Sequence, residues 1–288
     1  MEKYKVVIVG AGIAGMSAAI NLKRAGITPL IIENNAPGGT LNYIPNIENY
    51  PGFESISGPD LAMNIYNQVN NLDIKIKSAN ISDIDLDKKI INNDIEFEYL
   101  IIATGRKSRL LGLENEKELL GRGISTCALC DGMFYKDKDV IVVGGGNSAL
   151  TESLYLSNIC KKVTIIIRRD NFTGDKYLID RIGNKKNIKV INNSNIISYN
   201  VKNNILVSVT LDNKKRVKTN GVFLALGGIP NSKLFNVEKE NDYILVNNKY
   251  ETNIPYAIGD VIKKDYYQLT TAASDAVIAS NNIIRINK

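Results

Sequence analysis

The sequence contains no histidine and only three cysteines in 288 residues. Without histidine, zinc sites that use imidazole, Ser-His-Asp triads and histidine general bases are all excluded. Cys127 and Cys130 form a C-x-x-C pair, but one such pair without a second pair or a histidine cannot close a tetrahedral zinc site within the chain. In a cytosolic protein, redox chemistry is therefore the leading use of these two cysteines.

The chain also lacks a long apolar run. The longest runs, such as residues 163–167, have the length of a strand, and none approaches the roughly 18 residues that a membrane span needs. The first residues lead directly into a strand and show no signal-peptide pattern. We therefore expect a cytoplasmic protein that does not bind membranes.

Basic residues are in modest excess, with a net charge of +6 and an isoelectric point near 9.0. Lysines and arginines alternate with acidic residues and asparagines and form no long basic tract, so nucleic-acid binding is not expected. A mildly basic surface suits acidic protein partners. Compositional bias of the source genome explains the abundance of Lys, Asn and Ile equally well.

Two segments of the chain repeat one arrangement of strand, glycine turn, helix, strand and terminal charge. In the first, an apolar run leads into a glycine turn at residues 10–15, and the second strand ends at Glu33. In the second, a strand at residues 139–143 leads into a glycine turn at residues 144–149. A helix is expected at residues 150–160, and the strand at residues 163–167 ends in two arginines. From first glycine to terminal charge the spacing is 23 residues in one copy and 24 in the other, which indicates two dinucleotide-binding modules.

The terminal charges of the two modules indicate different ligands. The glycines let the backbone approach a pyrophosphate, and the helix that follows offers free N–H groups. Glu33 can accept hydrogen bonds from ribose hydroxyls and would repel a 2′-phosphate, which fits the ADP half of FAD. Arg168 and Arg169 suit the 2′-phosphate of NADP. The alternatives are a turn that only packs a helix on a strand, and two solvated arginines at a strand end.

The C-x-x-C pair is suited to thiol chemistry. Such a pair can hold a disulfide and, when reduced, a thiolate of lowered pKa. Asp131 is the only acid beside it, and in a chain without histidine Asp131 is the candidate to move the proton that thiol exchange requires. Cys160 lies in a helical run, where we expect a small buried hydrophobe.

The remaining patterns complete an α/β arrangement. Apolar runs at residues 99–105, 222–228 and 256–260 are typical of strands that enter glycine turns, and residues 270–285 read as a closing helix. Short crossovers are expected near Gly112 and Pro230, with no low-complexity linker.

Together these motifs resemble the low-molecular-weight thioredoxin reductases along essentially the whole chain. The shared landmarks are residues 10–15, 38–41, 47–52, 103–105, 121–123, 127–132, 144–149, 259–261 and 266–268. The resemblance implies an α/β fold of two Rossmann-like, three-layer (ββα) dinucleotide-binding domains, assembled as a homodimer. The FAD domain would be discontinuous, residues 1–112 and 231–288, around an NADP-binding-like domain, residues 113–230, that carries the C-x-x-C pair.

The resemblance also implies roles for individual residues. Electrons would pass through FAD and the Cys127–Cys130 disulfide to thioredoxin, with Cys130 facing the flavin, Cys127 attacking the partner's disulfide and Asp131 as the acid. Asp260 would bind the ribityl chain. The residues expected to bind FAD are Gly10, Ala11, Gly12, Ile13, Ala14, Glu33, Gly39, Thr40, Leu41, Asn49, Ile81, Ala103, Thr104, Gly105, Gly259, Asp260, Tyr267, Gln268 and Leu269. Those expected to bind NADP are Gly144, Gly146, Asn147, Ser148, Arg168 and Arg169.

The chain departs from the family pattern at three places. The family's His-Arg-Arg-x-x-x-Arg reads Ile-Arg-Arg-Asp-Asn-Phe-Thr at residues 167–173, so that Thr173 stands where the last arginine would be. The family's Tyr-Arg-Gln reads Tyr-Tyr-Gln at residues 266–268, and its Glu-Glu-Ala reads Thr-Glu-Ser at residues 151–153. Most of these changes fall in the nucleotide domain and concern the electron donor.

Several hypotheses about the activity follow. NADPH is narrowly favoured as the donor, because Arg168, Arg169 and the intact second glycine turn would otherwise lack a purpose. Reduced ferredoxin is a close second, since some clostridial-type relatives use it and the basic surface suits such an acidic donor. A flavin redox sensor without turnover would not need the cysteine pair, and a ferredoxin–NADP reductase of the same fold normally lacks it.

Overall fold

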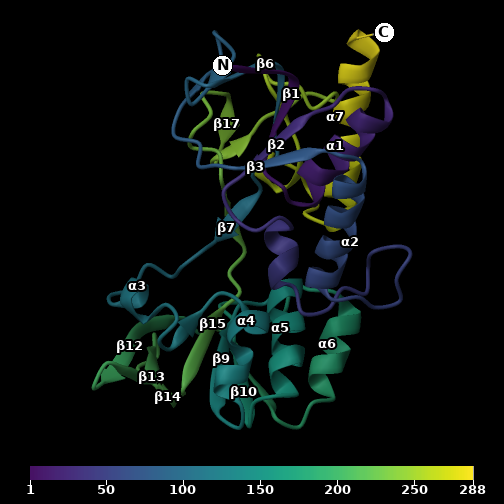
Figure 1. The fold of residues 1–288 in the computed structure, drawn as a ribbon. Coiled ribbons are helices and arrows are strands. Elements are labelled where there is room, and N and C mark those ends of the chain that lie inside the picture. Colours follow the sequence, from purple (N-terminus) through teal and green to yellow (C-terminus); the bar gives the residue numbers. More distant parts are fainter. Residues whose placement is uncertain (288) are drawn as a thin grey trace. The chain divides into compact units, whose positions relative to one another are not determined.

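The computed structural model describes residues 1–287 and divides into two compact units (Figure 1). The first unit comprises residues 1–42, 47–107 and the chain from Ile229 onward, and the second comprises residues 43–46 and 108–228. Apart from the short segment 43–46, the chain changes unit at β7 (Arg106–Ser108) and again at β16 (Gly228–Pro230), and these two strands pair with each other. The crossovers expected near Gly112 and Pro230 are close to these two changes of unit.

The first unit is built on a seven-stranded sheet. Its strands are β1 (Glu2–Val9), β2 (Leu30–Glu33), β3 (Lys75–Ser78), β4 (Ile84–Asp85), β5 (Ile90–Ile91), β6 (Ile95–Ile102) and β19 (Tyr256–Ala257). The order is β3-β2-β1-β6-β5-β4, with β19 beside β6; the β4–β5 and β5–β6 pairings are antiparallel and the other pairings are parallel. The carboxyl ends of β1, β2, β6 and β19 therefore lie at one edge, which is where ligands bind in open parallel sheets.

Helices cover this sheet and complete the first unit (Figure 1). They are α1 (Ile13–Arg24), α2 (Gly58–Asn71) and α7 (Leu269–Ile286), with the short turns η1 (Gly39–Tyr43) and η3 (Gly259–Val261) and the strand pair β17 (Lys239–Glu240) and β18 (Tyr243–Ile244). α1 and α7 pack together, and Ser280 Oγ donates a hydrogen bond of 3.3 Å to the carbonyl oxygen of Ala18. The apolar residues of β1 are buried completely or nearly so, as expected for a parallel strand that is covered on both faces.

The second unit is built on a five-stranded parallel sheet of order β11-β10-β9-β15-β8. Its strands are β8 (Ile124–Ser125), β9 (Asp139–Val143), β10 (Lys162–Ile166), β11 (Ile188–Ile191) and β15 (Gly221–Leu224). The helices are α3 (Glu116–Leu119), α4 (Ala128–Asp131), α5 (Asn147–Ser157) and α6 (Lys176–Gly183), with the turn η2 (Gly132–Tyr135). A smaller antiparallel sheet holds β12 (Ile196–Lys202), β13 (Ile205–Leu211) and β14 (Arg216–Lys218).

Alternate residues of β9 define three layers in this unit. Val140 and Val142 belong to a core cluster with the apolar residues of α5, such as Leu150. Ile141 and Val143 belong to another cluster, with β12 and β13. Because successive side chains of a strand point to opposite faces, the parallel sheet lies between a helical layer and the antiparallel sheet. The expected α/β class with two Rossmann-like domains is confirmed.

The sequence placed the helix of the second module too late. It was expected at residues 150–160, whereas α5 spans Asn147–Ser157. Gly146 already acts as the N-cap, and its carbonyl oxygen accepts a hydrogen bond of 3.1 Å from Leu150 N. The last residues of the glycine turn are therefore the first turn of the helix. Of the helices in the described residues, none combines the length and the apolar character that a membrane crossing requires.

Candidate functional site

The first glycine turn joins β1 to α1. Gly10 has a φ of +109°, and a Cβ there would collide with the carbonyl oxygen of Ala103, so this position requires glycine. A Cβ on Gly12 would meet nothing within 4 Å. Gly12 is the N-cap of α1, and no side chain from residues 1–287 caps this helix. The first N–H groups of α1 are therefore available to an anion such as a pyrophosphate, and buried side chains surround the turn: Ala11, Ile13 and Ala14.

Glu33 ends β2 beside this turn. Its Oε2 accepts a hydrogen bond of 2.8 Å from Ala11 N, and its Oε1 accepts one of 2.9 Å from Asn35 N. The carboxylate is half-buried and held at the edge where the parallel strands end. A carboxylate has lone pairs beyond these two bonds, so Glu33 can also accept hydrogen bonds from ribose hydroxyls, as the sequence predicts.

The segment before η1 lies against the first turn. Gly38 N donates to the carbonyl oxygen of Ala11 at 2.8 Å. Gly39 has a φ of +55°, and a Cβ there would lie 3.2 Å from Cα of Gly12. Thr40 is exposed and Leu41 is fully buried. The structure therefore brings the start of η1 to the glycine turn.

The segment after β6 is held by a residue that the sequence did not single out. Asn231 N donates to the carbonyl oxygen of Gly105 at 2.9 Å, and Asn231 Nδ2 donates to that of Thr104 at 3.1 Å. Thr104 Oγ1 donates in return to the carbonyl oxygen of Asn231 at 2.7 Å. Thr104 and Asn231 are 127 positions apart, and no local pattern signals that they meet.

The turn that carries Asp260 is held by a buried ion pair. Gly259 has a φ of +76°, and its N donates to Asp275 Oδ2 at 3.0 Å. The same oxygen accepts from Lys264 Nζ at 2.8 Å, and Asp275 is only 3% exposed. Asp275 on α7 therefore positions the Gly259–Asp260 turn, a role that sequence reasoning missed.

Arg106 contacts two of the predicted cofactor residues. Its Nη2 and Nε donate to Asp260 Oδ2 at 2.7 and 3.1 Å. Its guanidinium carbon lies 4.2 Å from the centre of the Tyr267 ring. Burial raises the pKa of Tyr267 to about 12, so the ring under the guanidinium is neutral. The only signal for Arg106 in the sequence was its position directly after Gly105.

Two further predicted residues meet across the fold. Asn49 Nδ2 donates to Gln268 Oε1 at 3.1 Å, although 219 positions separate them. Gln268 directly precedes Leu269, the first residue of α7. Ile81 shows no such polar role: it is partly buried and packs against the apolar core of the first unit.

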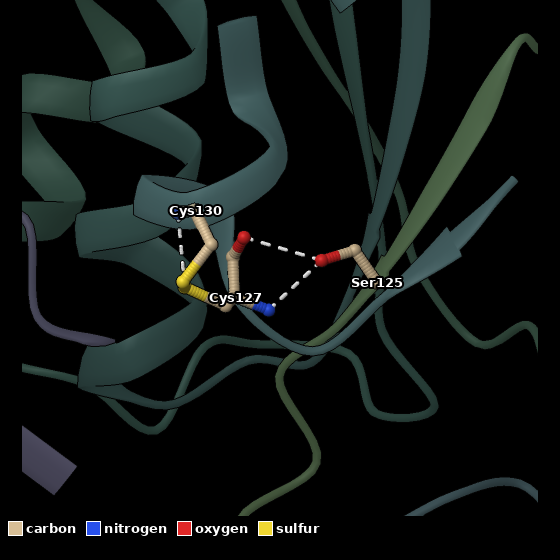
Figure 2. Close-up of a disulfide and its surroundings, with 3 residues drawn as sticks. All are labelled: Ser125, Cys127 and Cys130. Atoms are coloured by element: carbon tan, nitrogen blue, oxygen red, sulfur yellow. Dashed lines mark hydrogen bonds between the residues drawn. A yellow bond between two sulfur atoms is a disulfide. The ribbon is translucent and has the colours of Figure 1, made fainter. Parts of the chain in front are cut away.

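Cys127 and Cys130 form a disulfide at the start of α4, with their Cα atoms 5.4 Å apart (Figure 2). Ser125 Oγ accepts from Cys127 N at 3.0 Å and donates to the carbonyl oxygen of Cys127 at 3.1 Å. Cys130 N donates to Cys127 Sγ at 3.0 Å. Cys127 is therefore held on both sides, by Ser125 at the end of β8 and by the α4 backbone that its sulfur caps. Sequence reasoning missed Ser125.

The two cysteines differ in exposure. Cys127 is 8% exposed, whereas Cys130 belongs to the exposed surface. Cys130 is thus the more exposed residue of the pair, whereas the resemblance assigns the external attack to Cys127. Asp131 follows directly, half-buried, and its N donates to the carbonyl oxygen of Cys127 at 3.2 Å.

Cys160 takes no part in this pair. It is a free cysteine, 5% exposed, within the core cluster under α5. Burial raises the pKa of its thiol to about 11. It behaves as the small buried hydrophobe that the sequence predicts.

The second glycine turn repeats the geometry of the first. Gly144 has a φ of +141°, and a Cβ there would collide with the carbonyl oxygen of Ala225. Gly146 is the N-cap of α5, which no side chain in the described part of the chain caps. Arg168 and Arg169 are exposed and follow β10. A turn, free N–H groups and cationic side chains are thus present in one module.

The residues around this second turn also contact one another. Asn147 Oδ1 accepts from Asp175 N at 2.7 Å, and its Nδ2 donates to Asp175 Oδ2 at 3.0 Å. Thr173 N donates to the carbonyl oxygen of Gly145 at 2.8 Å. Ser148 is exposed. The loop that follows the two arginines therefore closes against the glycine turn.

The residues present fit the two expected dinucleotides. In the first module, the open space beside Gly12, the uncapped N-terminus of α1 and the carboxylate of Glu33 suit the ADP part of FAD. In the second module, a Cβ on Gly146 would approach only Thr173 Oγ1, at 3.9 Å, so space is also present beside this glycine.

Comparisons with known proteins agree with this arrangement. The family described as pyridine nucleotide-disulphide oxidoreductase matches residues 4–276. The thioredoxin reductase of Rickettsia prowazekii is 39% identical, over 99% of this chain and 98% of that protein. The crystal structure of Lactococcus lactis thioredoxin reductase in the FR conformation has a TM-score of 0.94 and 33% identity, over 98% of both chains. A ferredoxin-flavin thioredoxin reductase from Clostridium acetobutylicum has a TM-score of 0.54 and 27% identity, over 100% of this chain and 99% of that one.

The family match, the full-length relatives, the two dinucleotide modules and the disulfide all agree. This chain belongs to the pyridine nucleotide-disulphide oxidoreductase family, among the low-molecular-weight thioredoxin reductases, a group of oxidoreductases that use FAD and NADPH.

Proposed function

We propose that this chain passes electrons from NADPH to FAD, then to the Cys127–Cys130 disulfide, and then to the disulfide of thioredoxin. The observation that carries the proposal is the disulfide itself, which lies at the start of α4 (Figure 2). Met133 and Phe134 follow it in η2 and are 60% and 72% exposed. Two large exposed apolar side chains beside a redox disulfide suit contact with a protein substrate.

FAD, when bound, supplies a centre that takes up two electrons and passes them to the disulfide. Its ADP part is assigned to the first glycine turn, with the ribose at Glu33, and its ribityl chain to Asp260. The hydrogen bond from Gly259 N to Asp275 and the bonds between Thr104 and Asn231 support this assignment, because they hold the polar groups at the edge of the sheet.

The thiol exchange follows from the reduced pair. The Cys127 thiolate attacks one sulfur of the thioredoxin disulfide, and the other thioredoxin sulfur leaves as a thiolate that Asp131 protonates. The Cys130 thiolate then attacks Cys127 Sγ, which closes the disulfide and releases the second thioredoxin sulfur. The hydrogen bond from Cys130 N supports a thiolate on Cys127. Because Cys127 is 8% exposed, thioredoxin must uncover it.

Variants of the two cysteines test these roles. Cys130→Ser should keep its flavin and lose disulfide reduction. Cys127→Ser should also be inactive. It leaves the thiolate of Cys130 beside the flavin, which should be seen as a long-wavelength charge-transfer band. If the band appeared in Cys130→Ser instead, the two roles would be reversed. A colourless protein from flavin-replete cells, instead of about one FAD per chain, would end the proposal.

Exposed arginines support NADPH as the donor. Arg168 and Arg169 follow β10, where a 2′-phosphate would meet them. Each charge-assisted contact contributes about 1.5–3 kcal/mol. Because Thr173 stands where the family pattern has an arginine, NADPH binding should be about ten- to a hundredfold weaker than with that arginine. Thr173→Arg should therefore lower the Michaelis constant for NADPH and leave thioredoxin kinetics unchanged. Arg168→Ala combined with Arg169→Ala should abolish flavin reduction by NADPH.

Reduced ferredoxin is the second candidate donor. The net charge of +6 suits an acidic protein donor, and the Clostridium acetobutylicum structure bears the name of a ferredoxin-flavin thioredoxin reductase. An anaerobic titration of the oxidised protein, first with NADPH and then with reduced ferredoxin, separates the two donors by flavin bleaching. No bleaching at millimolar NADPH, with prompt bleaching by ferredoxin, would replace NADPH in the proposal.

The assembly and the location of the protein are part of the same proposal. The resemblance to thioredoxin reductases supports a homodimer that works in the cytoplasm. Analytical ultracentrifugation of the FAD-loaded protein tests the first point, and fractionation of the source cells tests the second.

A further inference from the structure

Arg106 stands out because its partners are themselves assigned to the cofactor. It directly follows residues 103–105, pairs with Asp260 at 2.7 Å and lies over the ring of Tyr267 at 4.2 Å. Arg106 and Asp260 are both 22% exposed at the side chain. A pair this well covered is less screened by solvent than a surface pair, so its charges act on their surroundings.

The contact with Tyr267 coincides with a departure from the family pattern. The family has Tyr-Arg-Gln at residues 266–268, and this chain has tyrosine at the middle position. Arg106, the first residue of β7, places its guanidinium over the ring of Tyr267. A cation over an aromatic face is attracted by the ring, so Tyr267 holds Arg106 there.

We propose that Arg106 is a positioning and tuning residue for the flavin, which supplies from the segment after β6 the positive charge that the family pattern carries at position 267. The inference rests on the proposed function, in that Asp260 and Tyr267 belong to the FAD site. The guanidinium orients the Asp260 carboxylate through two donors and neutralises its charge.

This charge has a direct effect on flavin reduction. Two-electron reduction leaves negative charge on the flavin ring at neutral pH, and a nearby cation stabilises that state, whereas an unpaired carboxylate opposes it. Removing Arg106 therefore leaves Asp260 unneutralised beside the cofactor and should disfavour the reduced state.

The experiment measures the flavin midpoint potential and the FAD dissociation constant of the purified FAD-loaded protein. Arg106→Gln should lower the equilibrium constant for reduction by about tenfold, or about 30 mV for a two-electron couple. Arg106→Lys, which keeps the charge but not the planar fork, should lose less. Lys107→Gln is the matched control, because it removes an exposed charge one residue away and should leave the potential unchanged.

An exchange of the two positions tests the proposal most sharply. The double variant Arg106→Gln with Tyr267→Arg restores the family arrangement and should recover most of the potential lost in Arg106→Gln. An unchanged potential in Arg106→Gln with full FAD content would overturn the inference and leave the proposed function intact. If Arg106→Gln lowers the potential and the double variant does not recover it, then Arg106 does not take the place of an arginine at position 267. Failure of the unmodified protein to bind FAD would instead overturn the proposed function.

Discussion

In the reduced protein without bound FAD we expect a small alkylating reagent to modify Cys130 before Cys127. Two effects on the ionisation of Cys127 oppose each other in the structure. The hydrogen bond of 3.0 Å from Cys130 N stabilises a thiolate on Cys127, whereas burial at 8% exposure disfavours it. The relative size of these two effects decides whether Cys127 ionises more readily than Cys130.

The magnitudes nearly cancel. A hydrogen bond to a charged group contributes about 1.5–3 kcal/mol. Cys160, at 5% exposure, gives an upper bound on what burial costs a thiolate in this unit: burial, together with the charge of Asp137, raises its pKa from 9.0 to about 11, which corresponds to about 3 kcal/mol. Neither effect gives Cys127 a clear advantage in ionisation, so access to the sulfur decides the order, and Cys130 is the exposed residue.

The assay is partial alkylation followed by mass spectrometry. The FAD-free protein is reduced without oxygen, treated with less than one equivalent of iodoacetamide at pH 7, quenched and digested, and the label on each cysteine is counted. Cys127→Ser and Cys130→Ser supply the rate of each sulfur alone. Preferential labelling of Cys127 would refute the reasoning, because the hydrogen bond would then outweigh both burial and access.

Three further predictions concern residues around the disulfide and on α5. Ser125→Ala removes both partners of the Cys127 backbone and should lower the free energy of unfolding by about 1–3 kcal/mol in urea titrations, whereas Ser125→Thr, which keeps the hydroxyl, should lose less. Asp131→Asn should slow thioredoxin reduction by about a hundredfold or more in stopped-flow assays, with an unchanged FAD content; an unaltered rate would exclude Asp131 as the acid. Burial raises the pKa of Glu152 from 4.5 to about 8, and its Oε2 has no hydrogen-bond partner among the described residues. Protonated Glu152 therefore makes its full contribution to the free energy of unfolding below pH 4.5, and this contribution is lost as the pH rises through about 8. Glu152→Gln should lack this loss, and parallel urea midpoints for the two proteins at pH 5 and pH 8 would contradict the reasoning.

Local sequence patterns predicted the division into two modules and most of their strands and helices. A glycine turn needs positive φ and close approach of the backbone at fixed positions, as at Gly10 and Gly144, so its spacing to the terminal charge is readable from the chain alone. Apolar runs located the buried parallel strands for the same reason, and β9 was placed at residues 139–143, where it lies. The predicted start of α5 was wrong because the whole glycine turn was interpreted as a loop, although Gly146 already caps the helix.

The fine structure of the site depended on tertiary contacts. Parallel strands bring their carboxyl ends to one edge, where segments far apart in the chain meet. Asn231 binds residues 104 and 105, and Arg106 pairs with Asp260 across 154 positions. No local period encodes such contacts, because each depends on which side chains the folded backbone brings within hydrogen-bonding distance. The sequence likewise determined that two cysteines could form a redox disulfide, but only the packing of α4 and β8 decided that Cys127 is buried and Cys130 exposed.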